Sequence, residues 1–257
     1  MSTLIVIPAR LGSTRLPQKP LRLLGGRPLI FRVWERVSAL DLADQVVVAT
    51  DSAAVADSLR ESGATVVMTR GDHASGTDRT AEVARLPAYA GHEVVVNVQG
   101  DEPFIAADAI AGARDLVAGG SFAVGTAAQP AASAILADPS VVKVIADREG
   151  RALYFSRAPI PFLRDAANAV ALAALVRAHI GVYAYTRDAL FRWVSLPPHP
   201  LELVEQLEQL RALADGIAIG VAPVAASPAG GVDTEDDLVA ANARWLRSHS
   251  PTTVGAS

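Results

Sequence analysis

The sequence predicts an α/β fold in which a mostly parallel β-sheet is flanked by helices. Short runs rich in Val and Ile, bounded by polar residues or by Gly and Pro, alternate with stretches of helical periodicity in the N-terminal part of the chain. Strands buried on both faces have this continuous apolar character, and a βαβα order implies parallel strands joined by right-handed crossovers. The two observations together indicate a Rossmann-like sheet.

The N-terminal elements can be assigned one by one. The predicted strands are Leu4–Ile7, Gln45–Ala49, Thr65–Met68 and Val94–Val98. After the first strand, Pro28 is expected at the first position of a helix, and apolar residues then recur at helical spacing as far as Leu40. Further helices are predicted over Ser52–Ser62 and Gly76–Leu86. Asp51 is expected to cap the helix that begins near Ser52.

Beyond about residue 120 the alternation loosens, which predicts a mixed or antiparallel extension of the sheet. The strands predicted there are Phe122–Ala128, Val141–Ala146, Ala152–Phe155, His179–Ala184 and Ile217–Val221. Two helices are predicted, Leu201–Ala214 and Glu235–Leu246, and the second begins with Thr234 and Asp237 at capping-box spacing. No linker or repeat divides the chain, so residues 1–257 are expected to form a single domain with an extension within about 120–200.

Composition excludes several classes of function. The net charge is -4, so the chain lacks the basic surplus of a protein that binds nucleic acid. Without Cys it can have no disulfide, thiolate zinc site or Cys nucleophile. The N-terminus does not resemble a signal peptide, and the longest apolar stretch, Ala166–Val176, is too short for a membrane span. We therefore expect a cytoplasmic protein without a membrane partner.

The loop after the first strand is expected at the carboxyl edge of the sheet, where open parallel sheets bind ligands. It carries Arg10, Arg15 and Lys19 among small residues, a combination that suits a triphosphate. Prolines on both sides restrict the backbone that carries Lys19. A solvated basic loop is the alternative interpretation. The pattern is neither GxGxxG nor a Walker A loop, which disfavours a nicotinamide-dependent oxidoreductase and a P-loop kinase.

The segment NVQGDEP (97–103) most strongly indicates a functional site. A buried strand runs into Gly100 and then into Asp101 and Glu102. Carboxylates at this edge suit Mg²⁺, which prefers carboxylate oxygens beside phosphates. A simple Gly-Asp turn is the alternative, but the basic loop expected at the same edge favours a site.

The segment from Ser75 to Arg79 is a second candidate for nucleotide binding. Ser75, Gly76 and Thr77 at a helix start offer free amides and hydroxyls to an anion or a base edge, with Arg79 in the first turn. Nearby His73 is expected to be a surface or capping residue, because the chain has no second His at ligand spacing from it.

Residues 7–21, IPARLGSTRLPQKPL, resemble the N-terminal signature of the 3-deoxy-manno-octulosonate (Kdo) cytidylyltransferases, or CMP-Kdo synthetases. The Ser-Thr-Arg-Leu-Pro part points to this branch of the sugar nucleotidyltransferases rather than to the CMP-sialate synthetases. Motifs that resemble the same family follow in the same order: VATD (48–51), NVQGDEP (97–103), YFSRAPIP (154–161), PLELVEQLEQLR (200–211) and GVDTEDDL (231–238). The fold that this implies is that of the nucleotide-diphospho-sugar transferases.

The resemblance implies an enzyme that transfers CMP from CTP to Kdo, giving CMP-Kdo and pyrophosphate for lipopolysaccharide biosynthesis. It also implies Mg²⁺ as cofactor, a homodimer, and in-line attack of the anomeric hydroxyl of Kdo on the α-phosphorus of CTP. Two alternatives stay open. One is a cytidylyltransferase for a related sugar acid, such as 8-amino-Kdo or sialate, and the other is a non-catalytic nucleotide-binding regulator. Loss of a metal-binding acid or of Lys19 would favour the regulator, and neither is missing.

The resemblance also implies residue roles. The catalytic set is Arg10, Lys19, Asp101 and Asp233, with Asp101 and Asp233 as metal ligands, although Asp233 by itself indicates only a helix N-cap. The nucleotide-binding set is Pro8, Ala9, Arg10, Ser13, Arg15, Lys19, Ser75, Gly76, Thr77, Arg79 and Gly100. The substrate-binding set is Gln99, Arg157, Arg164, His179, Tyr185, Glu202 and Gln209.

Physical arguments accompany the substrate set. The planar guanidinium of Arg157 suits a carboxylate, with a surface ion pair as the alternative. Strand alternation places His179 and Tyr185 on one face, while Tyr183 on the same face is expected to pack. Glu202 and Gln209 are predicted opposite the apolar stripe of their helix, which is formed by Leu203, Leu207 and Leu210. The Ala-rich stretch 166–176 departs from the family, so no lid or contact is assigned there.

Overall fold

The computed structural model describes residues 1–12, 15–131, 135–225 and 230–249. Within them a nine-stranded sheet has the order β11–β7–β10–β6–β1–β4–β5, and β8 pairs with both β10 and β9. The strands are β1 (Thr3–Ala9), β4 (Gln45–Thr50), β5 (Thr65–Met68), β6 (Val94–Asn97), β7 (Val124–Pro130), β8 (Lys143–Ala146), β9 (Ala152–Ser156), β10 (Arg177–Thr186) and β11 (Ile219–Pro223). A separate small hairpin consists of β2 (Leu23–Leu24) and β3 (Arg27–Pro28).

The sheet is mostly parallel with a mixed extension, as predicted. Strands β6, β1, β4 and β5 run parallel, with Val6 paired to both Val47 and Asn97. Strand β10 is antiparallel to β6, β7 and β8, and β11 joins β7 in parallel. The carboxyl ends of β1, β4 and β6 consequently meet at one edge, where the predicted ligand-binding loops begin.

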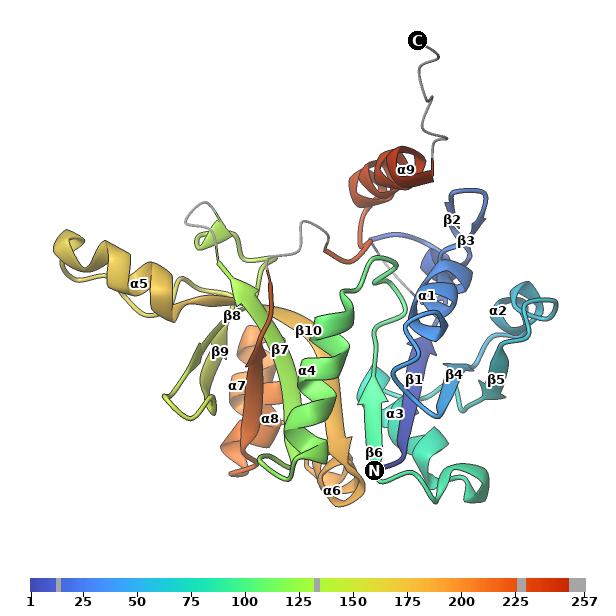
Figure 1. Cartoon of the computed structure of the whole chain (residues 1–257), viewed down its shortest axis with the longest axis horizontal. Coiled ribbons are helices and arrows are strands. Elements are labelled where there is room, and N and C mark those ends of the chain that lie inside the picture. The colour runs from blue at the N-terminus through green and yellow to red at the C-terminus, as the bar shows by residue number, and fades with distance from the viewer. Residues whose placement is uncertain (13–14, 132–134, 226–229, 250–257) are drawn as a thin grey trace, which may run out of the picture.

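Both faces of the sheet are covered by helices (Figure 1). The helices are α1 (Leu29–Ser38), α2 (Ala53–Ser58), α3 (Gly76–Arg85), α4 (Ala107–Ala118), α5 (Ala169–Leu175), α6 (Arg187–Ser195), α7 (Pro200–Glu205), α8 (Gln209–Ala214) and α9 (Glu235–His249), with 3₁₀ turns η1 (Lys19–Leu21), η2 (Pro87–Tyr89) and η4 (Ala166–Asn168). Alternation along β1 divides the core, because Leu4 and Val6 pack with α3 and α6 while Ile5 and Ile7 pack with α1 and α4. No helix of the described ranges is long and apolar enough to cross a bilayer.

The predicted single helix Leu201–Ala214 is wrong, because the chain forms two short helices there. Gln206 ends α7 in the left-handed region, with φ 52°, and α8 starts three residues later. Leu207 and Leu210 are buried as predicted, but Leu203 is 64% exposed. An amphipathic pattern does not reveal one left-handed residue, and the break rotates the second helix relative to the first.

Two further predictions at helix starts need correction. Pro28 lies at the N-cap of α1 and not at its first helical position, because it still pairs with Leu23 in the small hairpin. Ser52, and not Asp51, caps α2, since its hydroxyl accepts a hydrogen bond from the Val55 amide at 3.4 Å. Asp51 instead lies beside Arg79.

Helices α4 and α6 were not predicted. Helix α4 consists largely of Ala and Gly, and its Gly112 lets it approach β11, since an added Cβ there would lie 2.7 Å from Ala222. For α6 a signal exists in the sequence, because Thr186 caps the helix by accepting a hydrogen bond from the Ala189 amide at 3.2 Å.

Helix α9 is attached to the small hairpin by a contact that leaves no room for a side chain at Gly25. Gly25 has φ +55°, and an added Cβ would lie 2.3 Å from the Trp245 indole nitrogen. We expect Gly25→Ala to lower the free energy of unfolding by about 2 kcal/mol, because both the backbone strain and the clash must be relieved. Urea unfolding measures this, with Gly26→Ala as the control: Gly26 also has positive φ but open space around it. Equal losses in both variants would contradict the packing argument.

Candidate active site

Two neighbouring cavities open at the carboxyl edge of the sheet. The smaller cavity, of about 190 Å³, is lined by the loop after β1, by the start of α3 and by the turn after β6. The larger cavity, of about 670 Å³, lies towards β8, β10 and the α7–α8 region. Both cavities are lined by Gln99 and Asp101, so they meet at the turn that the NVQGDEP motif forms.

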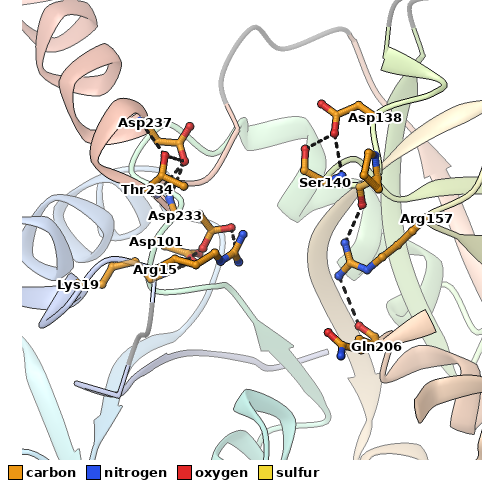
Figure 2. A network of polar contacts seen from close by, with 11 residues as sticks. Arg15, Lys19, Asp101, Asp138, Ser140, Arg157, Gln206, Asp233, Thr234 and Asp237 are labelled. Carbon is orange, nitrogen blue, oxygen red and sulfur yellow. Dashed lines mark hydrogen bonds and ion pairs between the residues drawn. The ribbon is translucent and has the colours of Figure 1, made fainter. Parts of the chain in front are cut away.

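Lys19 joins the two predicted metal-binding acids. Its ammonium contacts Asp101 Oδ2 and donates a hydrogen bond to Asp233 Oδ1 at 2.8 Å, while Arg15 pairs with the other oxygen of Asp233 at 3.0 Å (Figure 2). Burial acts to lower the pKa of Lys19, but the two carboxylates outweigh it and raise that pKa. Burial likewise acts to raise the pKa of Asp233, and Lys19 and Arg15 outweigh it and lower that pKa. Acids from distant parts of the sequence therefore converge on one cation.

Asp233 is aimed into the site by the start of α9. The Asp237 carboxylate accepts hydrogen bonds from the amides of Asp233 at 3.1 Å and Thr234 at 2.8 Å, and from the Thr234 hydroxyl at 2.8 Å. The Thr234 hydroxyl in turn accepts from the Asp237 amide at 3.2 Å. Thr234 and Asp237 thus form the predicted capping box, and the interpretation of Asp233 as the N-cap is wrong. Its carboxylate is left to face Lys19.

The donor set at this point fits Mg²⁺. Asp101 and Asp233 present carboxylate oxygens to a common point, and hard divalent cations prefer such oxygens. Within the described residues no group of three or more acids or histidines could hold a metal ion alone, so further oxygens would come from a bound phosphate. Burial, with Asp101 and Asp233 adding to it, raises the pKa of nearby Glu102 to about 8. Glu102 is therefore mostly protonated at neutral pH, and Asp101 and Asp233 are the two carboxylates that would hold the ion.

The smaller cavity contains most of the predicted nucleotide-binding residues. Its lining includes Pro8, Ala9, Arg10, Lys19, Ser75, Gly76, Arg79 and Gly100. Gly100 is required by packing, because an added Cβ would lie 2.6 Å from the Pro8 carbonyl oxygen. Ser75 and Asp78 form a capping box at the predicted start of α3. Arg79 is held by contacts to the Thr69 hydroxyl and to Asp51, the latter at 3.5 Å.

His73 also lines the smaller cavity, which corrects its prediction as a surface or capping residue. Its side chain is only 6% exposed, and Nε2 contacts the Glu82 carboxylate. Burial acts to raise the pKa of Glu82, but the hydrogen bonds and charges of His73 and Arg70 together outweigh it and lower that pKa. No sequence signal distinguishes this buried His, because its partner lies on the next helix.

Three of the predicted substrate-binding residues, Arg157, His179 and Gln209, line the larger cavity, together with Gln99 at the junction. Tyr183 lines it as well, although the sequence indicated only packing. Glu208 was missed. Its carboxylate accepts hydrogen bonds from the Ser75 and Thr77 hydroxyls, both at 3.0 Å, so it links the two cavities. Thr77 accordingly lines the larger cavity and not the smaller one.

The structure does not bring the remaining predicted residues to the cavities. Arg164 is exposed and lines neither cavity. Tyr185 is fully buried against Trp193, with ring centroids 5.6 Å apart. Glu202 forms a two-point ion pair with Arg211, at 2.8 and 2.6 Å, so it faces the protein interior. Arg15 reaches the site only through Asp233, and Ser13 lies outside the described residues.

Arg157 directs its donors to backbone carbonyls. It donates to the carbonyl oxygens of Glu205 and Pro139, both at 3.0 Å, and across the described chain it has no carboxylate side chain as an ion-pair partner of its guanidinium. The alternative of a surface ion pair is therefore wrong. The guanidinium has five N–H donors, so it can still donate to a ligand.

His179 packs between the rings of Phe155 and Tyr183, with centroids 5.1 and 5.3 Å away, and Nε2 lies 2.9 Å from the Thr126 hydroxyl oxygen. Burial lowers its pKa to about 3. The unfolded chain gains a proton near pH 6.5 and the folded chain does not, so stability present above pH 6.5 is lost as pH falls towards 3.

We expect His179→Gln to reduce this pH dependence. Between pH 6.5 and 4.5 the free energy of unfolding should fall more steeply in the wild type than in the variant, by up to about 1.4 kcal/mol per pH unit. Urea unfolding at a series of pH values measures the difference. Parallel pH dependence in the two proteins would show that His179 takes up its proton equally well in the folded state.

Known proteins are similar to this chain over most of its length. Residues 4–219 match a family model described as cytidylyltransferase. The 3-deoxy-manno-octulosonate cytidylyltransferase of Gemmatimonas aurantiaca is 60% identical over 250 residues, which cover 97% of this chain and 96% of that protein. The protein of the same name from Methylococcus capsulatus is 49% identical over 253 residues, with coverage of 96% and 98%.

Solved structures are similar to this chain as well. The structure of a CMP:2-keto-3-deoxy-manno-octonic acid synthetase complexed with CTP matches with a TM-score of 0.88 and 39% identity, covering 96% of this chain and 100% of that one. The 4-diphosphocytidyl-2C-methyl-D-erythritol synthase of Anaerococcus prevotii matches with a TM-score of 0.63 at 13% identity, covering 96% and 99%. The second likeness shows the fold alone.

Proposed function

The chain belongs to the cytidylyltransferase family, and from this premise we propose that it transfers CMP from CTP to 3-deoxy-manno-octulosonate, releasing pyrophosphate. One observation carries the proposal. The smaller and the larger cavity meet at Asp101, where Lys19 and Asp233 also converge. A reaction between two bound substrates needs such a junction, because their reacting atoms must approach in a fixed geometry.

The smaller cavity suits the nucleotide. Arg10 and Lys19 provide positive charge, and Gly76 and Gly100 let the backbone come close to a ligand. The helix start at Ser75 offers amides and a positive dipole end to a phosphate. A relative that is 39% identical over nearly the whole chain was solved in complex with CTP, which supports CTP as the nucleotide of this chain.

The larger cavity suits a polyhydroxylated acid. Tyr183, Gln209 and Glu208 offer hydroxyl, amide and carboxyl groups that can bind hydroxyls, and Arg157 is the cation that faces the cavity. Burial raises the pKa of Glu208, while its bonds to Thr77 and Ser75 oppose this, so the group is less acidic than an exposed Glu. A less ionised Glu208 repels an anionic sugar less.

The chain's own residues then prepare the transfer. Lys19 and Arg10 offset negative charge on the triphosphate, and Gln99 at the junction can orient both substrates. The anomeric hydroxyl is held on the side of the α-phosphorus opposite the leaving pyrophosphate. We propose that Asp101 and Asp233 hold Mg²⁺, which when bound supplies positive charge to the α-phosphate and the pyrophosphate.

The cellular setting is also a proposal. We propose that the protein works in the cytoplasm as a homodimer and provides activated sugar for lipopolysaccharide. The projecting α5 region supports a dimer, because Phe162 and Val170 there are 88% and 85% exposed (Figure 1).

Identification of the product tests the proposed reaction. Purified protein with CTP and Mg²⁺ is offered Kdo, 8-amino-Kdo or N-acetylneuraminate in parallel. We expect a new phosphodiester resonance in the ³¹P spectrum and the mass of CMP-Kdo with the first acid, formed faster than the other products. Faster formation of another CMP-sugar would move the assignment to a related sugar acid.

A further inference from the structure

Lys143, the first residue of β8, is a buried cation that the proposed reaction does not use. None of its surface is exposed. Its ammonium donates hydrogen bonds to the carbonyl oxygens of Asp138 at 2.9 Å and Val141 at 2.7 Å, and to that of Arg157. All three donors of the ammonium are therefore engaged by backbone groups.

These carbonyls belong to two segments that form walls of the larger cavity and extend from the ends of β8 and β9, where Lys143 pairs with Ser156. Residues 138–142 form one wall, to which Ser140, Val141 and Val142 contribute, and Arg157 at the end of β9 belongs to the other. A second tie joins the same walls, because the Arg157 guanidinium donates to the Pro139 carbonyl at 3.0 Å. Figure 2 shows Ser140 and Arg157 at the right, across from Asp101 and Asp233 at the left.

The turn that residues 138–142 form is also held by hydrogen bonds within it. The Asp138 carboxylate accepts hydrogen bonds from the Ser140 amide at 2.8 Å and hydroxyl at 2.7 Å. The conformation of the turn is thus determined locally, and Lys143 positions the turn relative to Arg157. Without the ammonium, three carbonyl oxygens would lose their donor at a place that water reaches poorly.

The charge of Lys143 has no direct counter-ion. In the described part of the chain no carboxylate lies within ion-pair distance of its ammonium. Burial lowers the pKa of Lys143 and the nearby Arg157 adds to this, while Asp138 and Glu205 oppose it. Burying an ammonium is costly, and an apolar side chain would fill the space without that cost. The ammonium, unlike an apolar side chain, donates three hydrogen bonds to these carbonyl oxygens.

We propose that Lys143 is a positioning residue for the sugar acid: it ties residues 138–142 to Arg157 and so sets the shape of the cavity that holds this substrate. The inference rests on the proposed function. Neither wall contributes to the smaller cavity, so the effect is confined to the sugar acid and spares CTP.

Steady-state kinetics of Lys143→Met test the inference. We expect KM for Kdo to rise about 10- to 100-fold, because displaced walls misplace the substrate by a fraction of an ångström or more. KM for CTP should stay within about 2-fold of the wild type, since the smaller cavity is untouched. Lys143→Gln, which keeps two N–H donors without the charge, should give an intermediate KM for Kdo.

Arg211→Met is the matched control, because Arg211 is also a buried cation, 11% exposed, but lines neither cavity. It should lower the melting temperature and leave both KM values unchanged. A Lys143→Met protein that melts earlier but keeps the wild-type KM for Kdo would overturn the inference, as would equal increases in both KM values.

Two remaining outcomes are also decisive. If neither Lys143 variant folds, the residue supports the whole fold and the positioning role is overturned. A wild-type protein whose rate does not saturate with Kdo would instead contradict the proposed function itself, so the two failures are distinguishable.

Discussion

Asp101→Asn is expected to lower kcat about 1,000-fold while KM for CTP changes only a few-fold. The amide keeps the shape of the side chain but removes the negative charge that faces Lys19 and the proposed metal ion. Lys19 still pairs with Asp233, so the fold of the site should be retained. Initial rates of CMP-sugar formation at saturating CTP and Kdo measure the loss.

The control for Asp101→Asn is Asp236→Asn, an exposed acid in the first turn of α9 close to Asp233. Its turnover should match that of the wild type, because it is not part of the junction between the cavities. Near wild-type turnover of the Asp101→Asn protein would refute the assignment of Asp101 to the reaction centre.

Lys19→Met is expected to have two effects of opposite direction. It should lower kcat/KM for CTP by about 100- to 1,000-fold, because the triphosphate loses a buried cation. It should also tighten Mn²⁺ binding in the absence of nucleotide, because Asp101 and Asp233 then lose the ammonium that they share. In this account Lys19 and the proposed ion compete for the same two carboxylates.

Calorimetric titration with Mn²⁺, with and without CTP, separates these effects. Arg22→Met serves as control, since Arg22 pairs with Glu235 at the start of α9, close to Asp233, but faces solvent. It should leave Mn²⁺ affinity unchanged. Equal Mn²⁺ affinities of wild type and Lys19→Met without CTP would show that Lys19 does not compete with the ion.

The parts of the fold that sequence predicts well are those determined by local physics. The strands β1, β4, β5 and β6 follow from continuous apolar runs, and they appear within two residues of their predicted ends, although β5 lies at the sheet edge and has no buried residue. The capping box Thr234–Asp237 likewise follows from spacing alone. Because parallel strands end at one edge, the convergence of the first loop with Asp101 was also predictable.

The parts that sequence missed depend on tertiary contacts. The resemblance implied that Glu202 binds substrate, on the polar face of one continuous helix, but the left-handed Gln206 breaks that helix and Glu202 pairs with Arg211. The same break brings Glu208 to Ser75 and Thr77 on α3. Neither partner is near in sequence, so periodicity carries no information about these pairs.

Tyr183 lines the cavity where Tyr185 was predicted, and this difference has another cause. Tyr183 and Tyr185 share one face of β10, as alternation predicts, but Tyr183 lies beside Asn97 at the carboxyl end of β6 and Tyr185 lies deeper, beside Val95. Tyr183 reaches the cavity while Tyr185 is buried beside Trp193. The sequence gives the face of each tyrosine but not its depth relative to the edge where the cavity opens.

Release of pyrophosphate from CTP and Mg²⁺, with and without Kdo, tests the central claim most directly. If the two cavities hold CTP and the sugar acid and meet at Asp101, release should require Kdo and should be abolished by EDTA. Binding of CTP without pyrophosphate release in the presence of Kdo, 8-amino-Kdo or N-acetylneuraminate would contradict the claim and favour a nucleotide-binding regulator.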